Sequence, residues 1–328
     1  MRPVSRKVAA IVLGTALLTV IPLLAILSGE LLVISIVTKM MIYGLAAASL
    51  DLILGVGGMA SFGHATYFGL GGYVVGILAF HGVAGEPLFG LIPGTVQILI
   101  AWPAAIAVTM IVAFVIGTLS LRTTGVNFVM ITLAFGQVIY FLFVSLKQYG
   151  GDDGLILRQR NLIGSASLSD PVIFYYVCLV CLATALLFFH LLVGSRFGRI
   201  IQGARHNERR MAALGVNTYP FKVACFVIAG GGAGLAGALM ANLNRFVGPD
   251  LLHWTESGQL MVMVILGGIG TLFGPVLGAA ALVGLEMTLT SFTEHWMFVL
   301  GPLLVVIVLF NKHGIWGLVV GSKRPAGG

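Results

Sequence analysis

Residues 195–222, SRFGRIIQGARHNERRMAALGVNTYPFK, form a basic polar segment between two long apolar runs. Six of the chain's 18 lysines and arginines lie in this segment, and Glu208 is its only acidic residue. The runs on either side are long and apolar enough to cross a bilayer, whereas this segment is not. Short basic loops are retained on the cytoplasmic side of membranes, so residues 195–222 are predicted to lie there. Within them, residues 204–214 are predicted to form a helix, which the 215–220 segment ends.

The composition of the whole chain indicates a membrane protein. Of the 328 residues, 59% are hydrophobic and 9% are charged, and the mean hydropathy is +1.06. Soluble domains typically carry about 25% charged residues, so this chain has too few for an ordinary solvated surface. The predicted fold class is an all-α polytopic membrane protein. The net charge of +7 does not indicate a nucleic-acid partner, because the basic residues cluster beside apolar runs.

The apolar runs predict about eight to ten transmembrane helices in a single domain, residues 1–328. Most basic residues fall in segments assigned to the inside, and both termini are predicted to be cytoplasmic. Residues 81–94, 147–171 and 242–258 are expected outside. The predicted spans are 8–27, 31–54, 65–80, 96–119, 126–146, 172–193, 223–241, 259–278, 279–292 and 296–310.

Two glycine-rich stretches interrupt this pattern. Residues 55–63, GVGGMASFG, have too many glycines to hold a regular helix, and residues 266–278, LGGIGTLFGPVLG, contain Pro275. Irregular backbone is tolerated at membrane depth only against protein or a water-filled cavity. Both stretches are therefore predicted to be broken or re-entrant segments.

Enzymatic and metal chemistry find little support in the sequence. It has no G-x-x-x-x-G-K-[ST] phosphate loop, no zinc-like spacing and no nucleophile motif. Cys178 and Cys181 are expected to pack inside a helix, and no metal site is predicted. Asp51 and Glu286 could take part in a proton pathway, which a secondary transporter would require. The chain is predicted not to be an enzyme.

Five ordered stretches resemble a known family. They are DLILGVGGMASFGHATYFGLGGY (51–73), NFVMITLAFGQ (127–137), GGDDGL (150–155), SRFGRIIQGARHNERRMAALGV (195–216) and LGGIGTLFGPVLGA (266–279). Together they are similar to the permease subunits of branched-chain amino acid ABC importers, of the LivM type. The resemblance extends from about residue 31 to 318.

This resemblance implies an assembly in the bacterial inner membrane. Its parts are a second related permease, two cytoplasmic ABC ATPases and an extracytoplasmic solute-binding protein. The chain itself would bind no cofactor, since ATP would be used by the partner subunits. Solute would move by alternating access, with the 204–214 helix acting as a rigid lever in an ATPase groove.

Residues 195–222 would be the coupling loop of such an importer. Its 210–215 stretch, RMAALG, is a loose relative of the coupling motif of ABC importers, without that motif's acidic first residue. A simple positive-inside anchor on lipid headgroups is the competing interpretation. The predicted coupling residues are Arg205, Glu208, Arg209, Arg210, Ala212, Ala213 and Gly215.

A polar pathway is predicted near the broken segments. Broken helices can offer backbone groups to the amine and carboxylate of a zwitterion. Hydrogen bonding between helices would explain the same polar residues equally well. The candidates are Ser61, His64, Asn127, Thr132 and Gln137. Branched-chain amino acids are the favoured solute, with urea, short amides or another small polar solute as alternatives. A different hypothesis is that the chain forms an ATP-independent channel.

Overall fold

The computed structural model describes residues 3–85, 87, 93–164, 166–292, 295, 298, 301–302 and 314–320. Most of them are helical, which confirms the all-α fold class. The helices are α1 (Pro3–Ser28), α2 (Leu31–Asp51), α3 (His64–Ala84), α4 (Ile98–Ser120), α5 (Val126–Ser145), α6 (Pro171–Gly194), α7 (Arg196–His206), α8 (Glu208–Ala213), α9 (Tyr219–Asn244), α10 (Trp254–Gly267), α11 (Gly274–Phe292) and α13 (Gly314–Val320).

Seven helices in the described part of the chain are long and apolar enough to cross a membrane. They are α2 with the turn that follows it, α3, α4, α5, α6, α9 and α11. The polytopic prediction is therefore confirmed. Helix α1 adds a shorter apolar stretch, Leu13–Leu27. The predicted span 296–310 lies largely outside the described residues, so the total of eight to ten stays a prediction.

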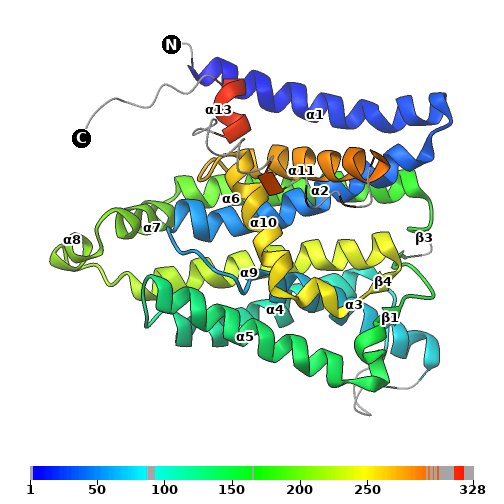
Figure 1. The fold of residues 1–328 in the computed structure, drawn as a ribbon, viewed down its shortest axis with the longest axis horizontal. Helices are drawn as coiled ribbons and strands as arrows, with labels where there is room; N and C mark the ends of the chain where they lie inside the picture. The colour runs from blue at the N-terminus through cyan, green and yellow to red at the C-terminus, as the bar shows by residue number, and fades with distance from the viewer. Residues whose placement is uncertain are drawn as a thin grey trace.

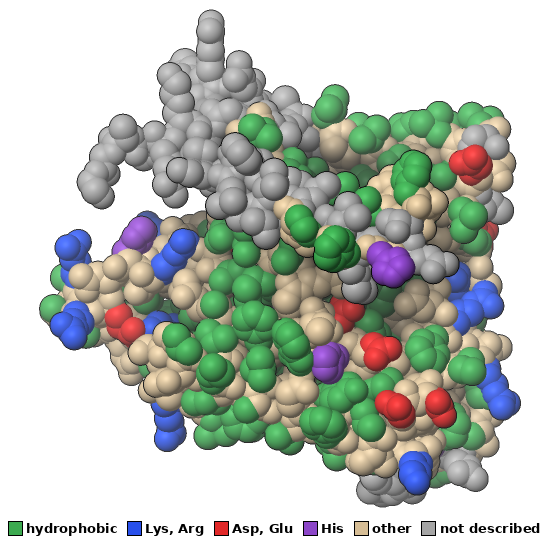
Figure 2. All heavy atoms as spheres, in the orientation of Figure 1, with side chains coloured by type: hydrophobic (Ala, Val, Ile, Leu, Met, Phe, Trp, Pro, Cys, Tyr) green, Lys and Arg blue, Asp and Glu red, His purple; other side chains and the backbone are tan. Residues whose placement is uncertain are grey.

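Most of the long helices run side by side, and α7 and α8 project from one end of the bundle (Figure 1). We call this the α8 end. The other end, here the strand end, carries the two-residue pairs β1 (Leu155–Ile156) with β4 (Phe246–Val247), and β2 (Leu162–Ile163) with β3 (Ala166–Ser167). Lysine and arginine side chains gather at both ends, with a mainly hydrophobic band between them (Figure 2). This distribution suits a protein that crosses a bilayer.

Helices α3 and α9 form the centre of the bundle. Within their most apolar stretches, 67% and 72% of the residues are buried, against 17% in α5. The two backbones touch at glycines: a Cβ on Gly237 would lie 2.7 Å from the carbonyl carbon of Phe68 and 3.1 Å from the amide nitrogen of Gly72. Small residues allow this approach, which stabilises helix pairs in lipid through close packing.

Both predicted broken segments are present at the α8 end. Helix α2 runs into a single π-helical turn, η1 (Leu52–Val56), and residues 57–63 are non-helical. Residues 268–273 are non-helical between α10 and α11. Pro275 is the second residue of α11 and begins that helix rather than kinking one, because the first turn does not need its amide hydrogen.

The predicted single helix 204–214 is wrong. The chain breaks at Asn207, whose backbone is extended at φ −161° and ψ 99°. The Asn207 side chain accepts a hydrogen bond from the amide of Arg210 at 2.9 Å and so caps a separate helix, α8. The predicted end at 215–220 is confirmed, since α8 stops at Ala213 and Gly215 adopts a positive φ of 79°.

Candidate functional site

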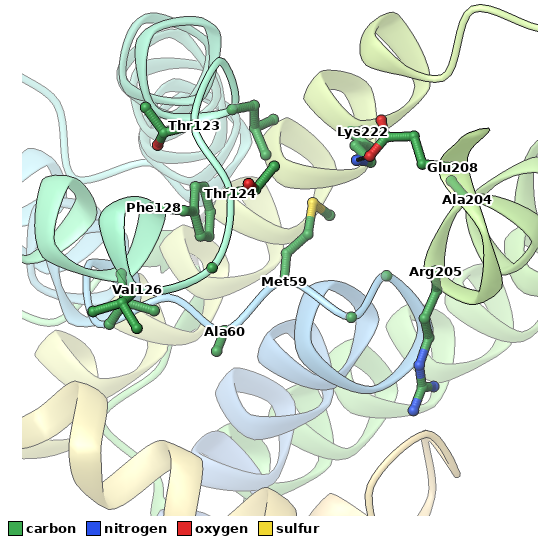
Figure 3. Close-up of a pocket in the computed structure, with 15 residues that line it drawn as sticks. Met59, Ala60, Thr123, Thr124, Val126, Phe128, Ala204, Arg205, Glu208 and Lys222 are labelled. Atoms are coloured by element: carbon green, nitrogen blue, oxygen red, sulfur yellow. Dashed lines mark hydrogen bonds and ion pairs between the residues drawn. The ribbon is translucent and has the colours of Figure 1, made fainter. Parts of the chain in front are cut away.

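A cavity of about 440 Å³ lies at the α8 end (Figure 3). One wall is the broken segment 57–60, and a second is the 121–126 turn with the first residues of α5. The remaining wall comes from the hairpin of α7 and α8 and from Lys222 of α9. Figure 3 shows Met59 pointing into the space between these walls. The cavity is therefore bordered by one broken segment and by the basic segment.

Glu208 stabilises the base of the hairpin that α7 and α8 form. Its carboxylate accepts hydrogen bonds from Lys222 Nζ at 2.7 Å and from the Thr218 hydroxyl at 2.8 Å. The hydrogen bond from Lys222 holds the pKa of Glu208 below its usual range. The single acidic residue of residues 195–222 thus ties the start of α8 to the start of α9.

The outer surface of α8 is available to a partner. Arg209, Arg210, Ala212, Ala213 and Gly215, all predicted coupling residues, are exposed. Beside them the side chain of Leu214 is 71% exposed. Leu214 was not among the candidates predicted from the sequence.

Arg205 is exposed as well, but its side chain reaches the bundle. Its guanidinium Nη1 donates a hydrogen bond to the carbonyl oxygen of Gly55, in η1. In Figure 3 its side chain extends away from the centre of the cavity. Arg205 therefore binds the body of the bundle rather than the outer face of the hairpin.

Three of the predicted pathway residues lie buried near one another. Ser61, His64 and Thr132 have no exposed side-chain surface. A Cβ on Gly63 would lie 2.7 Å from the Thr132 carbonyl oxygen, so the broken segment packs directly against α5. The Ser61 hydroxyl accepts a hydrogen bond from the Gly63 amide at 3.2 Å.

His64 faces α2. Its Nε2 lies 2.9 Å from the Ser49 hydroxyl, whose own proton goes to the Ala46 carbonyl at 2.7 Å. The Nε2 atom is therefore the donor, and Nδ1 is left without a hydrogen-bond partner among the described residues. This arrangement gives His64 a clear role between helices.

The structure does not bring Asn127 and Gln137 into the same group. Asn127 is exposed at the start of α5, although its neighbours Val126 and Phe128 both line the cavity. Gln137 is half-buried more than two turns further along α5, and its amide nitrogen has no hydrogen-bond partner in the described part of the chain. A solute role for all five predicted residues stays a prediction.

Charged residues of α2 and α11 pair with each other in the bundle. Lys39 Nζ lies 4.0 Å from Glu286 Oε1 and 5.8 Å from the centre of the Tyr43 ring. Glu256, expected in an outer loop, lies in the first turn of α10, and its Oε2 is buried without a hydrogen-bond partner among the described residues. Lys39 of α2 is thus a partner for Glu286, which the sequence placed with Asp51 among the candidates for a proton pathway.

Comparison with known proteins agrees with the resemblance. The family described as "Branched-chain amino acid transport system / permease component" matches residues 32–308. The chain belongs to this family. It is 27% identical over 310 residues to the high-affinity branched-chain amino acid transport permease LivM of Salmonella typhimurium, covering 86% of this chain and 69% of that protein. LivM of Escherichia coli K12 is 26% identical with the same coverage. BraD of Pseudomonas aeruginosa is 26% identical over 285 residues, covering 84% of this chain and 91% of that protein.

No solved structure matches the chain. The family assignment therefore rests on sequence and agrees with the seven membrane-compatible helices. As a member of this permease family, the chain is a multi-pass membrane transport protein. The cavity at the α8 end and the buried polar residues beside it are thus features of a permease.

Proposed function

We propose that this permease is the membrane-spanning subunit of an ABC importer for branched-chain amino acids. It works as a single transmembrane domain in the inner membrane, with the α8 end facing the cytoplasm. Two separate cytoplasmic ATPases supply the energy, a second related permease completes the pathway, and an extracytoplasmic binding protein delivers the solute. The permease itself binds no nucleotide.

The observation that carries this proposal is the surface of the α7–α8 hairpin. It projects from the bundle (Figure 1). Arg209 and Arg210 of α8 are exposed, and so is Leu214, which follows α8 directly. A short helix that projects from the bundle with its basic side chains exposed can fit a groove in a partner. A simple lipid anchor would not require the hydrogen bonds of Glu208 that hold the hairpin in one shape.

In an alternating-access mechanism, the cavity and the broken segments each have a role. The cavity is the solute exit at the α8 end, and the non-helical segments 57–63 and 268–273 change shape when the ATPases close. Helix α5 leaves most of its surface uncovered, which suits a face shared with the second permease. Branched-chain amino acids are favoured as the solute because LivM and BraD bear that specificity in their names.

The first test is affinity purification of the permease from its native membrane in mild detergent. Two ATPases and a second permease should be recovered with it. The double variant Arg209→Ala, Arg210→Ala should release the ATPases, while Arg199→Gln, an exposed position on α7, should retain them. A chain recovered alone that conducts solute in liposomes without ATP would refute the proposal and favour a channel.

A second measurement addresses the solute. Uptake of labelled leucine by the complete complex should be inhibited by isoleucine and valine and not by urea or acetamide. Inhibition by urea or acetamide alone would replace the proposed solute while leaving the importer assignment intact.

A further inference from the structure

Asp51 fastens one broken segment to the end of α2. Its carboxylate is fully buried and accepts hydrogen bonds from the amide of Gly270 at 2.7 Å and from the amide of Leu272 at 3.0 Å. Both amides belong to the non-helical segment between α10 and α11. Leu272 adopts a positive φ of 58°, which is unfavourable for a residue with a side chain. Asp51 therefore holds a strained piece of backbone in one conformation.

The second broken segment meets the first at the same point. A Cβ on Gly270 would lie 3.4 Å from the Gly55 carbonyl oxygen, so the backbone of η1 touches the 268–273 segment directly. A Cβ on Gly55 would overlap both the Asp51 carboxylate and the Gly270 amide. Single π-helical turns are rare and occur often at functional sites, and this one lies against the other break.

Arg205 connects this junction to the basic hairpin. From the last turn of α7 its guanidinium reaches the Gly55 carbonyl, and its aliphatic part passes Gly58, where a Cβ would lie 2.8 Å from Arg205 Cγ. A Cβ on Gly270 would be 3.7 Å from Arg205 Nη1. One side chain of the hairpin thus contacts both breaks.

We infer that Asp51 and Arg205 are positioning residues that transmit movement of the hairpin to the two broken segments at once. This inference rests on the proposed function, in which ATPases move the hairpin. A hydrogen bond to a charged group resists separation more strongly than apolar contacts, which can slide. Movement of α7 therefore carries η1 through Arg205, and Asp51 makes the 268–273 segment follow η1.

The test uses the complete importer in proteoliposomes with its binding protein, and it records ATP hydrolysis and solute uptake together. The variants are Asp51→Asn, which keeps the shape and loses the charge, and Arg205→Gln. Each should lower the solute carried per ATP by about tenfold or more while ATP hydrolysis stays within about twofold of the wild type. Arg205→Lys should recover part of the ratio, and the control Arg199→Gln should keep it.

An unchanged ratio of solute carried to ATP hydrolysed in both variants would overturn the inference. A loss of hydrolysis and uptake in equal proportion would also overturn it, because that result indicates that the two residues only stabilise the fold. If the wild-type complex shows no ATP-driven uptake, the proposed function itself fails. The two failures are therefore distinguishable.

Distances between spin labels test the same inference if the Asp51 and Arg205 variants do not assemble into the importer. Spin labels at His206→Cys and Ile269→Cys, both exposed positions, report on α7 and on the 268–273 segment in an otherwise wild-type complex. Their separation should stay constant between the nucleotide-free and ATP-bound states, while the distance from His206 to a label at Asp152→Cys changes. Independent movement of His206 and Ile269 would overturn the inference.

Discussion

Replacement of Gly237 by alanine should destabilise the permease, because α3 and α9 are in backbone contact there. The new Cβ would lie 2.7 Å from the Phe68 carbonyl carbon and 3.1 Å from the Gly72 amide nitrogen. A carbonyl group inside a helix cannot rotate away, so the two helices must separate. Overpacking of this kind costs typically 1–3 kcal/mol, and backbone contact places it near about 3 kcal/mol.

A gain in helix propensity offsets part of this cost. Alanine is favoured over glycine in a helix by about 1 kcal/mol, which leaves a net loss of about 2 kcal/mol. With an unfolding entropy of about 2.1 cal/mol/K per residue over 328 residues, the midpoint of thermal unfolding should fall by about 3 °C. The matched control is Gly284→Ala in α11, whose Cβ would meet only Met40 Cε, at an ordinary 3.6 Å. That variant should equal or exceed the wild type.

The assay uses the native cysteines. Cys225 in α9 and Cys178 in α6 are buried, so a fluorogenic thiol reagent reacts with them as the bundle opens on heating. A midpoint for Gly237→Ala at or above that of the wild type, together with an unchanged Gly284→Ala, would refute the backbone contact between α3 and α9.

Three further predictions concern the α8 end. Lys222 lowers the pKa of Glu208, so the stabilisation of the hairpin is present above the ordinary carboxyl pKa and is lost as the pH falls through the lowered one. Amide exchange over residues 208–222 should therefore be faster in Glu208→Gln than in the wild type at neutral pH and equal at low pH; a difference that persists in acid contradicts this. Leu214→Asp should reduce the retention of the ATPases by the permease at least about tenfold. The thermal midpoint of the isolated permease should stay within about 1 °C of the wild type, since the Leu214 side chain is mostly exposed. Full retention of the ATPases would exclude Leu214 from the interface. Thr132→Val should alter the KM for solute several-fold if its hydroxyl faces the pathway, as uptake by the complete complex would reveal, and an unchanged KM would leave Thr132 as a contact between helices.

Hydropathy predicted the long helices to within a few residues, because a membrane-spanning run must be apolar over its whole length. The span predicted at 259–278 is the exception, because α10 ends at Gly267 and α11 begins at Gly274. The start of α9 was also placed late, at Val223 instead of Tyr219. Pro220 caused this late start, because proline usually indicates the end of a helix. In the first turn of a helix proline is favourable, since amide hydrogens there have no partner within the helix.

Contacts across long sequence separations could not be predicted. Asp51 is bound by backbone amides more than 200 positions away, and backbone amides leave no mark in a sequence. Lys39 and Glu286 pair between α2 and α11, and only the fold brings them together. The break at Asn207 is a different case, because its capping bond to Arg210 is local and asparagine is a favoured N-cap residue.

The glycines of this permease serve two opposite purposes, and the neighbours of each glycine decide which one applies. In α3 and α9 they lie inside regular helices, and the absence of a side chain lets two backbones lock together, which makes the centre rigid. At Gly58, Gly268 and Gly270 they adopt positive φ values in non-helical backbone, a conformation that residues with a side chain rarely adopt. Because α3 and α9 are locked together, they rearrange little relative to each other. In the proposed transport cycle, relative movement between the hairpin and the centre is absorbed at the two breaks, which Arg205 and Asp51 join through their hydrogen bonds.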